Sequence, residues 1–171
     1  MLERNAYERI AHDATGTLRA SAIVLLVALV HGGCDFLRAR AFGWSPFVAP
    51  MFGLLGEVAF WAGAGLGGAA LSRRCFGVSA PLGAYYRGLG LAAVSGIFIV
   101  VPTAASVFAP GSERIGLPFV ALYRGATLFV ALRSAGRLSW TQGVFVSFAA
   151  VVSGFSAVAA ITVPLSVGFP G

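Results

Sequence analysis

Residues 46–71 read PFVAPMFGLLGEVAFWAGAGLGGAAL, an apolar run with a single acidic residue, Glu57, near its middle. A helix rises about 1.5 Å per residue, so a helix from Phe47 to Leu71 exceeds the roughly 30 Å hydrocarbon thickness of a bilayer. Its many glycines would destabilise a helix in water, but in lipid small residues let neighbouring helices approach closely. The run therefore predicts a tilted membrane-spanning helix against which other helices pack.

The composition of the whole chain is that of a membrane protein. Of its 171 residues, 58% are hydrophobic and only 11% are charged, whereas a typical soluble domain has about 25% charged residues. All basic residues apart from two histidines are arginines, and the net charge is +6. Because no basic run alternates with aromatic residues, this charge favours contact with anionic lipid over nucleic-acid binding.

Four further apolar segments complete the predicted fold: residues 20–37, 88–109, 115–132 and 141–165. We expect an all-α integral membrane helix bundle with five transmembrane helices, in which Pro102 kinks the third. Before them, residues 1–18 place apolar side chains such as Tyr7, Ile10 and Ala11 on one helical stripe. This pattern predicts an amphipathic helix on the membrane surface, as a segment separate from the transmembrane domain of residues 19–171.

The arginines outside the predicted spans fall mainly on one side of the membrane. One side would hold three (Arg38, Arg40 and Arg114) and the other eight (Arg4, Arg9, Arg19, Arg73, Arg74, Arg87, Arg133 and Arg137). Positively charged loops stay in the cytoplasm. We therefore expect a multi-pass protein of a bacterial inner membrane, with its N-terminus cytoplasmic and its C-terminus periplasmic or extracellular.

Charged residues inside the membrane are costly, so Glu57 and Arg124 are the first candidates for a functional role. Both would lie roughly nine residues, or about 14 Å, from the outer ends of their helices and could therefore meet. We favour a structural ion pair that fixes helix register over a proton or ion relay. His31 and Asp35, four residues apart near the end of the first span, are further polar candidates. With Cys34 they lack the paired ligands of a specific metal site, so we expect no bound metal or cofactor.

The glycines of the second span are expected to serve helix packing. Gly63 and Gly67 form a G-x-x-x-G pattern, which is typical of close contact between membrane helices, and Gly56 lies about two turns earlier. No Ser/His/Asp set, phosphate-binding loop or metalloprotease motif is present. We therefore expect a non-enzymatic protein.

Several segments resemble the bacterial branch of the YIP1 domain family. They are NAYERIAHDATGTLRASAIVLLVALVHG at 5–32, Trp61 in the second span, SRRCFGVSAPLGAYYRGLGLAA at 72–93 and LYRGATLFVALRSA at 122–135. The resemblance implies five transmembrane helices, a cytoplasmic N-terminus and no catalytic residues. Eukaryotic relatives are partners of prenylated small GTPases in vesicle traffic. Their acidic Asp-Leu-x-Gly-Pro type segment is absent here, which argues against a trafficking role.

These observations predict a scaffold or accessory subunit of a larger membrane complex, such as a respiratory or photosynthetic one. Its partners would be other membrane protein subunits and lipids, with no nucleic acid and no small-molecule substrate. One alternative is a small transporter or a proton or ion conductor in which Glu57, Arg124, His31 and Asp35 line the path. Another is a Yip1-like protein that organises or shapes the lipid bilayer.

Overall fold

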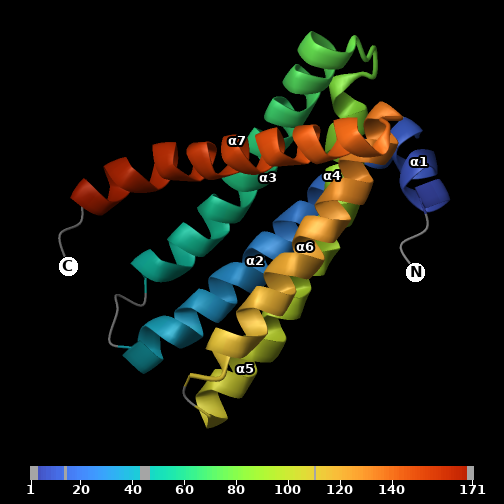
Figure 1. Ribbon diagram of the computed structural model, residues 1–171. Coiled ribbons are helices and arrows are strands. Elements are labelled where there is room, and N and C mark those ends of the chain that lie inside the picture. The colour runs from blue at the N-terminus through green and yellow to red at the C-terminus, as the bar shows by residue number, and fades with distance from the viewer. Residues whose placement is uncertain (1–3, 14, 43–46, 110, 169–171) are drawn as a thin grey trace.

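The computed structural model describes residues 4–13, 15–42, 47–109 and 111–168, and every regular element in these ranges is a helix (Figure 1). The elements are α1 (Arg4–His12), α2 (Gly16–Phe42), α3 (Val48–Phe76), α4 (Leu82–Ala93), the 3₁₀ helix η1 (Val94–Ile99), α5 (Val100–Phe108), α6 (Glu113–Gly136) and α7 (Trp140–Gly168). The predicted all-helical fold is confirmed.

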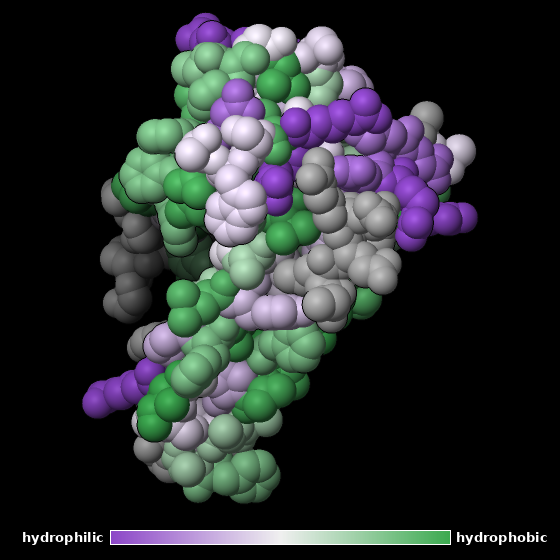
Figure 2. Space-filling model, turned by 45° about the vertical axis from the view of Figure 1, so that its right-hand side comes forward, coloured by the Kyte–Doolittle hydropathy of each residue, from purple (hydrophilic) through white to green (hydrophobic). Residues whose placement is uncertain are grey.

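Within the described ranges, five helical segments are long and apolar enough to cross a membrane, as the sequence predicted. They are Gly16–Arg40, Val48–Phe76, Leu82–Ser106, Arg114–Gly136 and Trp140–Val163. Figure 2 shows hydrophilic residues gathered mainly in its upper half, while hydrophobic residues cover most of the narrower lower part of the molecule. Apolar residues that face outward are expected where lipid, not water, surrounds the protein.

Helix α3 extends about one turn beyond the predicted end at Leu71. It continues through Arg73 and Arg74, whose positive charges are favourable at the carboxyl end of a helix. Gly77 ends the helix in the left-handed conformation, with φ 63°, and the Val78 amide donates to the Ser72 carbonyl at 3.1 Å. This arrangement is a common helix stop that only glycine adopts without strain.

The third span is irregular just upstream of Pro102, the residue expected to kink it. It begins at Leu82, earlier than the expected Gly88, and consists of α4, η1 and α5 in succession. The change in helix type lies at Val94–Ile99, before Pro102, and not at the proline itself. A proline ring collides with the carbonyl four residues earlier, which here belongs to Phe98 in η1. The disturbance is therefore expected upstream of Pro102.

The predicted interfacial helix over residues 1–18 is shorter in the structure. Residues 1–3 lie outside the described ranges, and α1 ends at His12. Asp13 Oδ1 accepts hydrogen bonds from Thr15 N at 2.9 Å and Thr15 Oγ1 at 2.7 Å, which hold the pKa of Asp13 below its ordinary value. Helix α2 then begins at Gly16, so the last residues of the expected segment belong to the first span.

The apolar stripe of α1 packs on protein. Tyr7 and Ala11 are buried, and α1 contacts α4 and α6. Burial raises the pKa of Tyr7 to about 12. Arg87, which the sequence suggested to be a loop residue, is buried in α4, where its Nε donates to the Ala11 carbonyl at 2.9 Å and its Nη1 donates to Thr17 Oγ1 at 3.2 Å. A cation at the carboxyl end of α1 is favourable, so Arg87 fastens α1 to the bundle.

Helix α3 contacts α2, α4, α6 and α7, with its most extensive contact to α7. Figure 1 shows α7 crossing over α3, while α2, α6 and the α4–α5 segment run alongside one another away from the crossing. Helices α6 and α7 contact each other and are joined by a turn in which the Leu138 amide donates to the Arg133 carbonyl at 2.9 Å. The second span is thus the central helix, as the sequence predicted.

Candidate functional site

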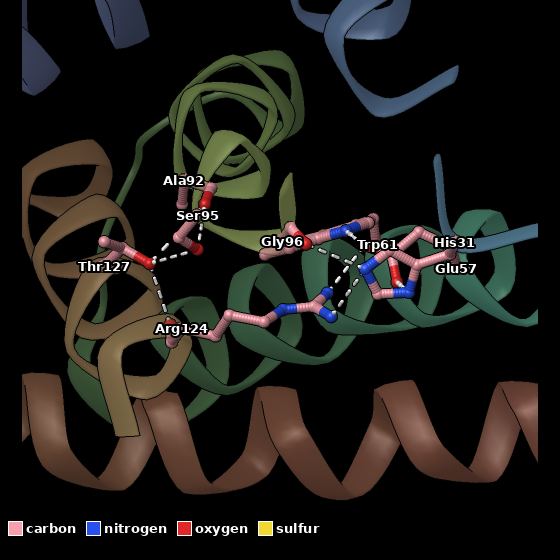
Figure 3. A network of polar contacts seen from close by, with 8 residues as sticks. All are labelled: His31, Glu57, Trp61, Ala92, Ser95, Gly96, Arg124 and Thr127. Atoms are coloured by element: carbon pink, nitrogen blue, oxygen red, sulfur yellow. Dashed lines mark hydrogen bonds and ion pairs between the residues drawn. The ribbon is translucent and has the colours of Figure 1, made fainter. Parts of the chain in front are cut away.

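Glu57 lies at the centre of a polar cluster of His31, Glu57, Trp61 and Arg124, which we call the charged cluster (Figure 3). The Glu57 side chain is only 5% exposed. Its Oε1 accepts hydrogen bonds from Trp61 Nε1 and from Arg124 Nη2, each at 2.6 Å, and its Oε2 lies 3.2 Å from His31 Nδ1. A buried carboxylate is costly unless it is both paired and hydrogen-bonded. Glu57 meets both conditions.

Two helices supply the ion pair at the core of the charged cluster. Trp61 follows Glu57 by four residues on α3, so both side chains lie on the same face of that helix. Arg124 reaches across from α6, and its guanidinium carbon lies 5.5 Å from the centre of the Trp61 ring and 5.9 Å from that of Phe60. Figure 3 shows the extended Arg124 side chain pointing toward Glu57 and His31. The structure thus places Glu57 and Arg124 in direct contact.

His31 connects α2 and η1 to the same cluster. Its Nε2 lies 3.1 Å from the Gly96 carbonyl oxygen and 3.5 Å from Arg124 Nη1. A Cβ at Gly96 would lie 3.2 Å from His31 Nε2, so a larger residue there would crowd the ring. Next to Gly96, Ser95 Oγ and Thr127 Oγ1 lie 3.0 Å apart and join η1 to α6. The charged cluster and its neighbours therefore tie four segments together.

Asp35, which the sequence grouped with His31, has its ion-pair partner outside the charged cluster. Its Oδ1 lies 3.4 Å from Arg38 Nη1, and Arg38 Nη2 donates to Thr103 Oγ1 at 2.9 Å. Asp35 also lies against Gly53 of α3. Among the residues that the structure describes, no group of three or more His, Cys, Asp or Glu side chains could hold a metal ion.

The three glycines singled out for packing have different surroundings. A Cβ at Gly63 would lie 2.6 Å from the Ser153 backbone oxygen and 2.8 Å from Ala157 Cβ of α7, and one at Gly67 would overlap the Ser153 side chain. Gly63 and Gly67 of α3, together with Ser153, Gly154 and Ala157 of α7, form what we call the glycine seam. At Gly56, by contrast, the nearest atom would be 3.7 Å away, which is ordinary contact. Gly56 therefore has room for a larger side chain.

Beside the charged cluster lies a cavity of about 750 Å³, lined mainly by residues of α3, α6 and α7. Its walls are mostly apolar, with Phe52, Phe60, Leu117 and Phe155 among the lining residues, while His31, Glu57 and Arg124 supply its polar part. Phe155 is 64% exposed, so the cavity reaches the surface of the molecule. Its volume is within the range of small-molecule binding sites.

Sequence reasoning did not identify two members of this site. Trp61 was noted only for the family resemblance, although its position four residues after Glu57 on a helix places its indole N–H on the same face as the carboxylate. Gly96 gave no signal, because its role depends on a backbone carbonyl that meets a side chain from another helix. No known protein family, curated protein or solved structure matches the chain. The resemblance to the YIP1 domain family stays a prediction.

Proposed function

We propose that the chain is a non-enzymatic, multi-pass protein of a bacterial inner membrane that acts as a scaffold or accessory subunit of a larger membrane complex. In this proposal the N-terminus is cytoplasmic and the C-terminus is periplasmic, as the arginine distribution favours. The charged cluster holds the helices together, and the outer faces of α6 and α7 meet partner subunits or lipid.

The observation that carries the proposal is the complete engagement of Glu57. Its Oε1 accepts from Trp61 and Arg124 at 2.6 Å and its Oε2 lies 3.2 Å from His31 Nδ1, so side chains of three helices surround the carboxylate. A carboxylate that carries ions must exchange partners during transport. Glu57 instead has Arg124, Trp61 and His31 already placed against its two oxygens. Such an arrangement favours a structural role, because breaking a buried pair is strongly destabilising.

The exposure of the last two helices supports contact with partners. In the most apolar stretch of α6, 22% of the residues are buried, and in that of α7 17% are buried. The corresponding share in the third span is 50%. Large aromatic side chains stand outward on both helices, among them Phe119 on α6 and Phe145 and Phe148 on α7. Aromatic residues are enriched at protein–protein interfaces and at membrane–water interfaces.

Purification in a mild detergent tests this proposal. We expect other membrane proteins to co-purify in a fixed ratio, and we expect Phe145→Ala/Phe148→Ala on α7 to lose them. Leu25→Ala/Leu29→Ala on α2, where both leucines are also exposed, is the matched control and should retain them. A chain that purifies alone, or one whose companions are unaffected by either variant, contradicts the proposal.

A proton or ion conductor is the second candidate. The observation that favours it is His31, whose ring has Glu57 at one nitrogen and both the Gly96 carbonyl and Arg124 near the other, beside an open cavity. Histidine and acidic residues in series are typical of proton relays in membranes. Flux into proteoliposomes that disappears in Glu57→Gln would favour this candidate over the accessory subunit.

The third candidate, a Yip1-like protein that organises lipid, depends on a free apolar face on α1. Tyr7 and Ala11 on that face are buried against other helices, which weakens this candidate. Deletion of residues 1–12 followed by measurement of membrane localisation tests it, because a lipid-organising helix should be required for correct placement.

A further inference from the structure

We infer that the cavity between α3, α6 and α7 is a binding site for a neutral amphiphile, one that has an apolar chain and a carbonyl group as hydrogen-bond acceptor. The cavity is about 750 Å³ in volume and its walls are mainly aromatic and aliphatic. Sites of this size and lining, with a few polar groups at one place, are typical of small-molecule recognition. This inference goes beyond the proposed role as an accessory subunit and does not depend on it.

The polar part of the cavity has donors to spare. An arginine side chain has five N–H groups, and Arg124 uses one Nη2 hydrogen for Glu57 while its Nη1 lies 3.5 Å from His31 Nε2. Within the described part of the chain, Arg124 Nε has no hydrogen-bond partner, and the side chain is 20% exposed beside the cavity. Glu57, in contrast, has both oxygens engaged. The unused N–H groups of Arg124 therefore favour a ligand that carries a hydrogen-bond acceptor.

Charge balance selects a neutral acceptor. The formal charges of Arg124 and Glu57 cancel across their 2.6 Å contact. A bound anion would add one uncompensated charge in a low-dielectric site, and unpaired charges in a membrane interior are costly. An ester or ketone oxygen accepts from Arg124 without adding a charge. An acyl ester is the simplest amphiphile with this chemistry, and its chain matches the apolar walls.

Two positions make the site accessible to experiment. Trp61 lines the cavity and is only 3% exposed, so a quencher in the surrounding lipid or detergent is kept away from its ring unless it enters the cavity. Gly125 also lines the cavity, and a Cβ added there would meet no atom within 4 Å. A leucine at 125 should therefore fill the cavity without displacing its walls.

The test uses Trp44→Phe/Trp140→Phe protein, in which Trp61 is the single tryptophan, purified in detergent. Its fluorescence is titrated with the methyl ester of 12-doxyl-stearate, with ionised 12-doxyl-stearate at high pH, and with 10-doxylnonadecane, which carries the same doxyl group on an alkane chain without a carbonyl group. We expect saturable quenching by the ester at the lowest probe fraction, and weaker quenching by the other two. The plateau should be lost in Gly125→Leu.

Gly33→Leu is the matched control, because Gly33 is an exposed helical glycine outside the cavity that also has no atom within 4 Å of an added Cβ. It should quench like the parent, and both leucine variants should keep the parent melting temperature. Quenching that rises without saturation, or equally in Gly125→Leu and Gly33→Leu, overturns the binding site. Tighter binding of the ionised acid or of 10-doxylnonadecane overturns the assignment of a neutral carbonyl ligand.

Discussion

Helix α3 contacts two of its neighbours, α7 and α6, in opposite ways. Toward α7 it presents the glycine seam, where Gly63 and Gly67 leave no space for a Cβ. Toward α6 it leaves a cavity of about 750 Å³ and makes its closest polar contact through a single long side chain, Arg124, that reaches Glu57 at 2.6 Å. Small residues allow helices in lipid to gain dispersion energy by close approach. Between α3 and α6, where the backbones do not approach closely, the hydrogen bond from Arg124 to Glu57 connects the two helices instead.

The difference between the two contacts predicts how each one fails. The glycine seam is spread over several residues and depends on shape, so a single added methyl group should weaken it by overpacking. The α3–α6 contact depends on a few hydrogen bonds, so loss of one partner leaves a buried charge behind.

The largest effect is expected for Arg124→Leu. The substitution leaves the Glu57 carboxylate buried without its cation, which should cost about 3–5 kcal/mol in the free energy of unfolding. The variant Glu57→Gln/Arg124→Leu removes the charge as well and should recover much of this loss. Thermal unfolding in detergent measures both. An unchanged melting temperature in Arg124→Leu would remove the structural role of the pair.

A smaller loss is expected for Trp61→Phe, which keeps a ring beside Arg124 but removes the Nε1 donor at 2.6 Å from Glu57. Hydrogen bonds to charged groups contribute about 1.5–3 kcal/mol, and the free energy of unfolding should fall by an amount in this range. In the Glu57→Gln background the same substitution should cost less. Equal costs in both backgrounds would show that the indole acts through packing alone.

On the other side of α3, Gly63→Ala should destabilise the protein by about 1–3 kcal/mol, because its Cβ would lie 2.6 Å from a backbone oxygen of α7 that cannot move independently. Gly33→Ala is the control in open space. A Gly63→Ala protein as stable as Gly33→Ala would mean that α3 and α7 are not in close contact.

The smallest effect is expected for Gly56→Ala, where the added Cβ would find its nearest neighbour, Val158 Cγ1, at 3.7 Å. Stability should stay within about 0.5 kcal/mol of the parent. The comparison of Gly56→Ala with Gly63→Ala in the same unfolding assay sharpens the contrast along a single helix. Equal losses at the two positions would contradict it.

The sequence predicted the fold well, because apolar length alone identifies membrane-spanning helices and lipid leaves few other structures open. It also pointed to Glu57 and Arg124, since charged residues within such helices are rare and need partners. It could not distinguish Gly56 from Gly63, because the difference depends on which residue of α7 lies opposite each. The same reason explains why Arg87 was placed in a loop, since its contact with the Ala11 carbonyl depends on how α1 and α4 pack together.

Distances between spin labels test the central claim most directly, which is that the charged cluster holds α6 to α3 while the glycine seam holds α7. Labels at Leu66 of α3 and Leu122 of α6 report one contact, and labels at Leu66 and Phe148 of α7 report the other; all three residues are exposed. In a Cys34→Ala/Cys75→Ser background, Arg124→Leu should broaden the Leu66–Leu122 distance distribution and leave Leu66–Phe148 unchanged. If both distributions stay narrow, or both broaden alike, the account is contradicted.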